Sequence, residues 1–253
     1  MKYEKRQRFR RRGIYLLPNL LTTLALFFGF YAIVAAFKGH FGQACLTVYI
    51  AMIFDSLDGR VARMTNTASP FGAEYDSLSD MVTFGIAPAL IAYFWGLSQL
   101  GKIGWLVAFV YAVATALRLA RFNIQVGRVS KRYFQGLPCP IAAAVVAGMI
   151  WTADSVGILG TQVTIFTACV TVFMALMMVS SVPYYSFKEI NFKGPVSFVI
   201  LLIAVLICVA IAINPPIVLF LSSFIFTLSG PILFLFGWNK RRRLAGRQVH
   251  TKK

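Results

Sequence analysis

The chain has 253 residues, of which 58% are hydrophobic and only 13% are charged. Soluble domains are about one quarter charged, so this composition excludes an ordinary soluble protein and indicates a membrane protein. The net charge of +17 is gathered mainly at the two ends, beside apolar segments, which is typical of basic flanks at anionic lipid headgroups and leaves no module for binding nucleic acid.

The apolar runs recur along the whole chain and predict an all-α fold, a polytopic membrane bundle of about eight transmembrane helices. Residues 1–14 form a basic segment that we expect to lie on the membrane surface. The last two helices fall within 191–238 as a membrane hairpin, and residues 239–253 form a basic tail. In chain order, we expect the helices at residues 17–37, 41–64, 72–97, 102–122, 138–153, 162–181, 195–213 and 216–237.

The connections between these helices differ in their basic residues. One side carries only Lys38 and Lys102. The connections on the other side carry Arg60, Arg63, Arg121, Arg128, Lys131, Arg132, Lys188 and Lys193. Because basic loops stay on the cytoplasmic side, we expect a protein of the cell (inner) membrane with both termini in the cytoplasm and its active site facing the cytoplasm.

Four aspartates lie in the second and third helices at helical spacing. Asp55 and Asp58 are three residues apart, and Asp76 and Asp80 are four apart, so each pair shares one face of its helix. The intervening turn, at about 65–71, is short, which brings both pairs to a similar depth near the cytoplasmic surface. Carboxylates in an apolar helix are costly unless paired or bound, and salt bridges to nearby arginines are the structural alternative.

The four carboxylates predict a metal site. At close range they repel one another and cannot all stay ionised without cations. All-oxygen ligands suit Mg²⁺ or Mn²⁺, and also Ca²⁺, rather than zinc. Two divalent ions bridged by shared carboxylates fit this ligand number and resemble two-metal phosphoryl-transfer sites.

Three further residues accompany the aspartates. Gly59 leaves room for a substrate to approach the backbone, and Gly72 opens the third helix one turn before Asp76. Arg63 can offer a bidentate grip to a diphosphate. Close helix packing by small residues is the alternative explanation for the glycines.

These positions form a pattern that resembles the complete signature of the CDP-alcohol phosphatidyltransferase family: Asp55-x2-Asp58-Gly59-x2-Ala62-Arg63-x8-Gly72-x3-Asp76-x3-Asp80. The resemblance implies a six-helix catalytic core over residues 15–190, commonly in a homodimer. It implies transfer of a phosphatidyl group from a CDP-linked lipid to an alcohol with release of CMP, with metal ions on the four aspartates and Asp80 as the base. It also implies a CDP-lipid site, which we assign to Asn19, Thr22, Gly59, Ala62, Arg63, Ser69 and Gly72.

Further stretches resemble the phosphatidylserine synthase branch of this family, which implies CDP-diacylglycerol and L-serine as substrates. They are residues 17–22, 77–88, 117–123, 134–140 and 180–188.

The sequence indicates the acceptor alcohol less specifically than it indicates the metal site. Serine carries a carboxylate, so we expect cations near the metal site and assign Arg118, Arg121 and Asn123 at the end of the fourth helix. Acceptors that carry a phosphate would also need cations, so phosphatidylglycerolphosphate or phosphatidylinositol-type synthesis remains an alternative. A second alternative is that the arginines serve only as basic residues that fix the orientation of the chain in the membrane. From a different class, a transporter with an acidic ion site is disfavoured because the acids form one contiguous motif and no repeat is present.

Overall fold

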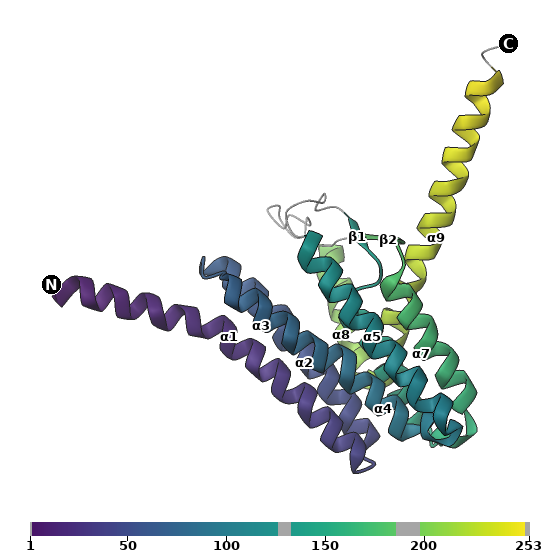
Figure 1. Cartoon of the computed structure of the whole chain (residues 1–253), viewed down its shortest axis with the longest axis horizontal. Helices are drawn as coiled ribbons and strands as arrows, with labels where there is room; N and C mark the ends of the chain where they lie inside the picture. Colours follow the sequence, from purple (N-terminus) through teal and green to yellow (C-terminus); the bar gives the residue numbers. More distant parts are fainter. Residues whose placement is uncertain (1, 126–132, 186–197, 251–253) are drawn as a thin grey trace.

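The computed structural model describes residues 2–125, 133–185 and 198–250, and these residues are almost entirely helical (Figure 1). A two-stranded antiparallel sheet, formed by β1 (Tyr133–Gln135) and β2 (Pro183–Tyr185), lies at one end of the bundle. The helical segments of the described residues are α1 (Lys2–Phe37), α2 (Phe41–Met64), a continuous helix from Pro70 to Trp95, α5 (Lys102–Gln125), α6 (Cys139–Ser155), α7 (Thr164–Val179), α8 (Phe198–Ile213) and α9 (Pro215–His250), with short 3-10 turns η2 (Leu97–Leu100) and η3 (Gly160–Gln162). The predicted all-α class is confirmed, with eight helical segments close to the expected places.

The lengths and compositions of these helices are those of an integral membrane protein. Three shorter apolar helices, Cys139–Ser155, Thr164–Val179 and Val199–Ile213, accompany the long ones. α2 is 24 residues long and carries two aspartates and two arginines in its second half. Among the described residues, four helices are long and apolar enough to cross a membrane: Leu17–Phe37, Pro70–Trp95, Lys102–Ile124 and Pro215–Ile232.

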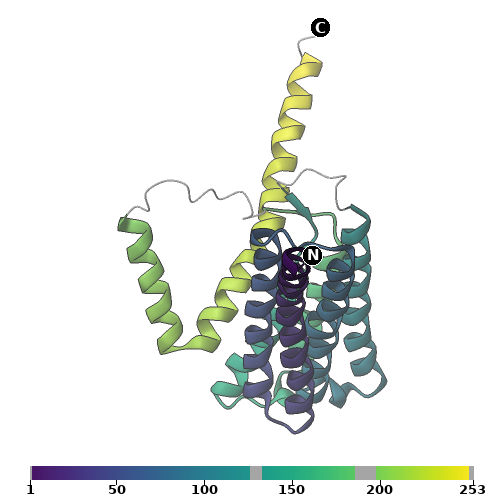
Figure 2. The same cartoon turned by 90° about the vertical axis from the view of Figure 1, so that its left-hand side faces the viewer.

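The two terminal helices are longer than expected. α1 begins at Lys2, so most of the basic segment 1–14 continues the first membrane helix without a break, and α9 continues through the expected tail to His250. Lysine, arginine and glutamine are good helix formers, and hydropathy alone does not show where such a helix stops. Both ends project beyond the bundle (Figures 1 and 2). Several basic residues expected in the inner connections lie outside the described residues: Arg128, Lys131, Arg132, Lys188 and Lys193.

The continuous helix from Pro70 to Trp95 changes its winding in the middle. It consists of α3 (Pro70–Asp80), a π-helical stretch η1 (Met81–Ile86) and α4 (Ala87–Trp95). Pro88 has no N–H to donate to the preceding turn, and the hydroxyl of Tyr111 on α5 donates to the carbonyl of Phe84, 3.3 Å away. This π-helical stretch follows Asp80 directly. It therefore sets the rotation of α3, which carries the aspartates, relative to α4, which packs in the core.

α1 packs closely against this helix at the level of the aspartates. The hydroxyl of Ser79 donates to the carbonyl of Thr22 at 3.2 Å, and that of Thr83 donates to the carbonyl of Ala25 at 3.4 Å. A Cβ on Gly29 would lie only 2.8 Å from the Cα of Thr83, so glycine permits this approach. Small residues and hydroxyl hydrogen bonds are the usual means of joining helices in a membrane.

α6 is the central helix, and ten of its seventeen residues are buried. α9 packs against it, since a Cβ on Gly148 would lie 3.0 Å from the Cα of Phe220. α9 also contacts the sheet, because the hydroxyl of Tyr184 on β2 donates to the carbonyl of Thr227 at 3.0 Å. α8 and α9 diverge as an open V (Figure 2), and α9 is the member of the expected hairpin that joins the core.

Candidate active site

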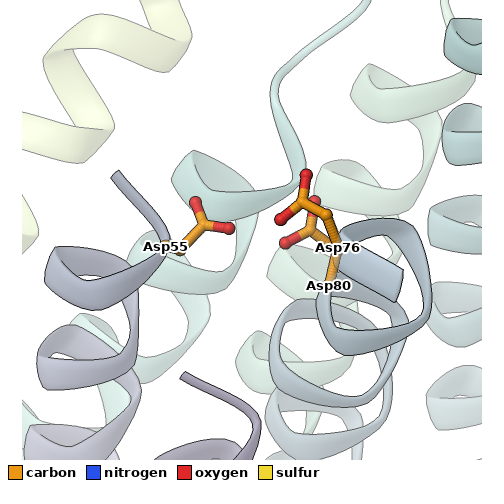
Figure 3. Close-up of side chains that lie close together, drawn as sticks. All are labelled: Asp55, Asp76 and Asp80. Carbon is orange, nitrogen blue, oxygen red and sulfur yellow. The ribbon is translucent and has the colours of Figure 1, made fainter. Parts of the chain in front are cut away.

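Three carboxylates converge between α2 and α3. Asp55 from α2 and Asp76 and Asp80 from α3 point toward one another (Figure 3), and one carboxylate oxygen from each lies within 4.8 Å of the others. All three side chains are half-buried, and the Oδ1 atoms of Asp76 and Asp80 are buried without a hydrogen-bond partner. Buried acceptors without donors are unfavourable unless a cation meets them. The residues present therefore fit a hard divalent metal ion.

The turn between α2 and α3 creates this convergence. α2 ends at Met64, and Thr67 donates its N–H to the carbonyl of Ala62 at 3.0 Å, which reverses the chain. Ser69 then caps α3, its Oγ accepting from the N–H of Gly72 at 3.0 Å, and Pro70 occupies the first turn. Both are favoured at a helix start. The tight connection places the two helices side by side with both aspartate pairs near the turn.

Asp58, the fourth predicted ligand, is not part of the three-carboxylate group. Its side chain is 5% exposed, and its Oδ2 accepts a hydrogen bond from the hydroxyl of Thr22 on α1 at 2.6 Å. Asp58 lies one turn closer to the end of α2 than Asp55, and its carboxylate is held against α1. Asp58 and Asp76 both line the pocket next to the cluster.

The pocket has a volume of about 200 Å³ and lies between α1, α2 and the start of α3. The structure brings all seven predicted CDP-lipid residues together in its wall: Asn19, Thr22, Gly59, Ala62, Arg63, Ser69 and Gly72. Four lining residues were missed by the sequence analysis: Pro18, Thr67, Ala68 and Ala73. They lacked side chains with a recognisable chemistry, and the packing of α1 against the turn is what places them there.

The pocket combines open space with groups that attract an anion. A Cβ on Gly59 would meet no heavy atom within 4 Å, so the backbone of α2 is open there. The N-terminal residues of α3 and Arg63 line the pocket, and a helix N-terminus and a guanidinium group both favour an anion. Asp58 and Asp76 also line the pocket. This arrangement suits a phosphate group placed between positive protein groups and metal ions.

The three predicted acceptor residues lie at separate places. Arg118 on α5 is near enough to Asp80 to interact with it electrostatically, and its Nη1 lies 3.4 Å from the Sγ of Cys139. Arg121 donates to the carbonyls at the end of α7, and the Nδ2 of Asn123 donates to the hydroxyl of Ser77 at 3.0 Å. Arg121 is almost one turn further along α5, which moves it away from the aspartates to the end of the bundle.

Comparison with known proteins agrees with the site. Residues 15–180 match the CDP-alcohol phosphatidyltransferase family. A relative from Helicobacter pylori strain ATCC 700392 / 26695, named CDP-diacylglycerol–serine O-phosphatidyltransferase, is 38% identical over 78% of this chain and 83% of its own. Relatives of the same name are 36% identical in Methanocaldococcus jannaschii, over 75% of this chain and 83% of the relative, and 35% identical in Mycobacterium tuberculosis strain H37Rv, over 81% and 74%. The chain belongs to the CDP-alcohol phosphatidyltransferase family.

Proposed function

We propose that this protein is an enzyme that transfers the phosphatidyl group of CDP-diacylglycerol to the hydroxyl of L-serine, forming phosphatidylserine and CMP. One observation carries the proposal. The pocket lined by the seven predicted CDP-lipid residues adjoins the three-carboxylate cluster, because Asp76 belongs to both. Serine as the acceptor is supported by the relatives, which share 35–38% identity over most of the chain and carry serine in their names.

The aspartates are proposed to hold two divalent ions, Mg²⁺ or Mn²⁺, with Ca²⁺ as a further candidate. Asp55, Asp76 and Asp80 supply converging oxygens, and Asp58 completes the ligand set from the pocket side. Once bound, such ions polarise the phosphoryl oxygens and stabilise the charge of the departing CMP. The partnerless Oδ1 atoms of Asp76 and Asp80 support this assignment.

The pocket is proposed to receive the cytidine diphosphate part of the lipid. Arg63 and the N-terminus of α3 bind the diphosphate, and Gly59 and Gly72 let it approach the backbone. Asn19 and Ser69 offer hydrogen bonds to the nucleotide, and Ala62 leaves space beside it. The acyl chains extend sideways from the pocket into the bilayer.

Asp80 is proposed to act as the base. Of its two carboxylate oxygens, the one that a metal ion would leave free can take the proton of the serine hydroxyl. The serine oxygen then attacks the lipid-side phosphorus, and the bond to the CMP oxygen breaks. Arg118, beside Asp80, binds the serine carboxylate, whereas Arg121 and Asn123 shape the acceptor site through their bonds to α7 and α3.

We further propose that the protein lies in the cell (inner) membrane with both termini and the pocket on the cytoplasmic side. The basic ends of α1 and α9 both project from the bundle (Figure 1), and Arg60 and Arg63 lie near the end of α2, which borders the pocket. The basic ends would contact anionic lipids. A homodimer is the assembly that the family resemblance implies.

The proposed reaction is tested with purified protein in detergent micelles containing CDP-diacylglycerol labelled in the cytidine. Release of labelled CMP is measured with serine, glycerol 3-phosphate, inositol 1-phosphate or no acceptor, and Asp76→Asn serves as the inactive control. We expect release that depends on serine and on Mg²⁺ or Mn²⁺. Release that depends on another alcohol would reassign the acceptor, and no release with any of them would contradict the enzyme class.

A further inference from the structure

We propose that Thr22 is a positioning residue that joins the two aspartate-bearing helices and orients Asp58 toward the metal site. This inference rests on the metal-dependent function proposed above. The side chain of Thr22 engages α2, because its hydroxyl donates to the Oδ2 of Asp58 at 2.6 Å. Its main chain engages α3, because its carbonyl accepts from the hydroxyl of Ser79 at 3.2 Å. One residue of α1 thus contacts both helices that carry aspartates.

Burial makes this chain of hydrogen bonds important. Thr22, Asp58 and Ser79 are only 4%, 5% and 2% exposed, so water does not replace a lost partner easily. Removal of the hydroxyl would leave a carboxylate oxygen buried without a donor, which is a larger loss than that of an exposed hydrogen bond. The carboxylate of Asp58 would then be free to turn.

The hydroxyl of Thr22 has one proton and two acceptors nearby. The carbonyl of Pro18 lies 3.1 Å away, whereas Oδ2 of Asp58 lies 2.6 Å away. Hydrogen bonds to a charged carboxylate are shorter and stronger than those to a carbonyl, which favours donation to Asp58. With Oδ2 engaged in this way, Oδ1 of Asp58 is the oxygen that we assign to a metal ion. Partners that fix a metal ligand in this manner typically change metal affinity or activity by about 10- to 100-fold when removed.

The next residue provides a matched comparison. Thr23 is exposed, and its hydroxyl contacts the carbonyl of Asn19 at 2.7 Å and the hydroxyl of Tyr75 at 2.9 Å. It has the same side chain on the same helix, and its hydroxyl bonds to a carbonyl and a tyrosine hydroxyl rather than to a carboxylate. Thr23→Val therefore removes an equivalent hydroxyl from α1 without disturbing the metal ligands.

The experiment compares Thr22→Val, Thr22→Ser and Thr23→Val in the purified full-length protein. Binding of Mn²⁺ alone is followed by the loss of the free-ion signal in electron paramagnetic resonance. The Mn²⁺ concentration for half-maximal CMP release and the KM for CDP-diacylglycerol are measured in parallel. We expect Thr22→Val to weaken Mn²⁺ binding and raise the half-maximal Mn²⁺ concentration by about 10- to 100-fold. Thr22→Ser keeps the hydroxyl, and Thr23→Val leaves Thr22 intact. In both variants the Mn²⁺ affinity and the half-maximal Mn²⁺ concentration should stay within about threefold of the wild type, a smaller change than the loss of a charge-assisted hydrogen bond would cause.

Three results would overturn the proposal. They are wild-type Mn²⁺ binding in Thr22→Val, equal losses in Thr22→Val and Thr22→Ser, or a rise in the KM for CDP-diacylglycerol alone, which would make Thr22 a nucleotide contact only. If Thr22→Val does not fold, Thr22→Ala removes the same hydroxyl with less bulk and is judged by the same criteria. An unmodified protein that neither binds Mn²⁺ nor needs it would instead contradict the proposed metal-dependent function.

Discussion

The guanidinium of Arg121 on α5 donates a hydrogen bond to the main-chain carbonyl of Val179, the last residue of α7, at 3.0 Å. Its second nitrogen donates to the carbonyl of Ser180 at 3.1 Å. The final carbonyls of a helix have no partner within the helix, so Arg121 stabilises the end of α7. Arg118, less than one turn earlier, instead points its Nη1 to within 3.4 Å of the Sγ of Cys139 and is near enough to Asp80 to interact with it electrostatically. Arg118 and Arg121, which the sequence analysis assigned to the same acceptor site, therefore make different contacts.

Substitution of these two arginines should separate substrate binding from stability. Arg118→Gln should raise the KM for serine about tenfold or more, because a hydrogen bond to a charged group is lost, with little change in the melting temperature. Arg121→Gln should destabilise the fold by about 0.5–1.5 kcal/mol, because two partly exposed hydrogen bonds to the carbonyls at the end of α7 are lost, with a smaller effect on KM. Steady-state kinetics and thermal unfolding in detergent measure the two effects. The reverse pattern would assign the acceptor to Arg121.

Asp80→Asn keeps the size of the side chain and removes its capacity to accept a proton. We expect CMP release to fall by about 100-fold or more, the range typical of a lost general base. Asp154→Asn, at the opposite end of α6 from the sheet, is the matched control and should retain activity. Near-normal turnover of Asp80→Asn at saturating metal would exclude Asp80 as the base.

Two glycines should respond in opposite ways to the same added methyl group. Gly59→Ala places its Cβ in open pocket space, so the fold should be as stable as before or more so by up to about 1 kcal/mol, while the KM for CDP-diacylglycerol rises. Gly29→Ala drives a Cβ against the backbone of Thr83 and should destabilise by about 1–3 kcal/mol. Unfolding curves and lipid KM values measured side by side test both. A destabilised Gly59→Ala with unchanged KM would show that this glycine serves packing.

Removal of divalent metal should stop the reaction and lower the stability of the protein. A ligand that binds only the folded state adds about 2.7 kcal/mol of stability at a hundred times its dissociation constant. We therefore expect EDTA to abolish CMP release and lower the melting temperature, and Mn²⁺ or Mg²⁺ to restore both. The triple variant Asp55→Asn, Asp76→Asn, Asp80→Asn should show no metal-dependent shift in melting temperature. Full activity in excess EDTA would contradict the metal assignment.

The sequence predicted the parts of the site that depend on local spacing. The intervals between Asp55 and Asp58 and between Asp76 and Asp80 define helix faces, and the short turn before Ser69 brings those faces together. The family resemblance supplied the seven residues of the CDP-lipid site, and the structure brings them into one pocket.

Features that depend on contacts between distant helices could not be predicted in this way. The bond between Thr22 and Asp58 joins residues 36 positions apart and depends on the rotation of α1. The sequence shows Pro88, but not that Tyr111 would satisfy the carbonyl of Phe84 or that a π-helical stretch would follow Asp80. The separation of Arg118 from Arg121 likewise depends on where α7 ends.

The position of the pocket along the bundle has a consequence for how the two substrates meet. Asp55 lies nine residues before the end of α2, about 13 Å of helix, and the pocket occupies the interval between that level and the turn. In the orientation proposed above, the diphosphate of a lipid bound in the pocket would lie at the boundary between headgroups and hydrocarbon, with the acyl chains at the depth they occupy in a bilayer. In that orientation, serine would have to move only a short distance from the water to reach the aspartates. The proposed reaction could thus join a membrane lipid to a water-soluble amino acid. The lipid would not have to leave the bilayer, and the amino acid would not have to cross it.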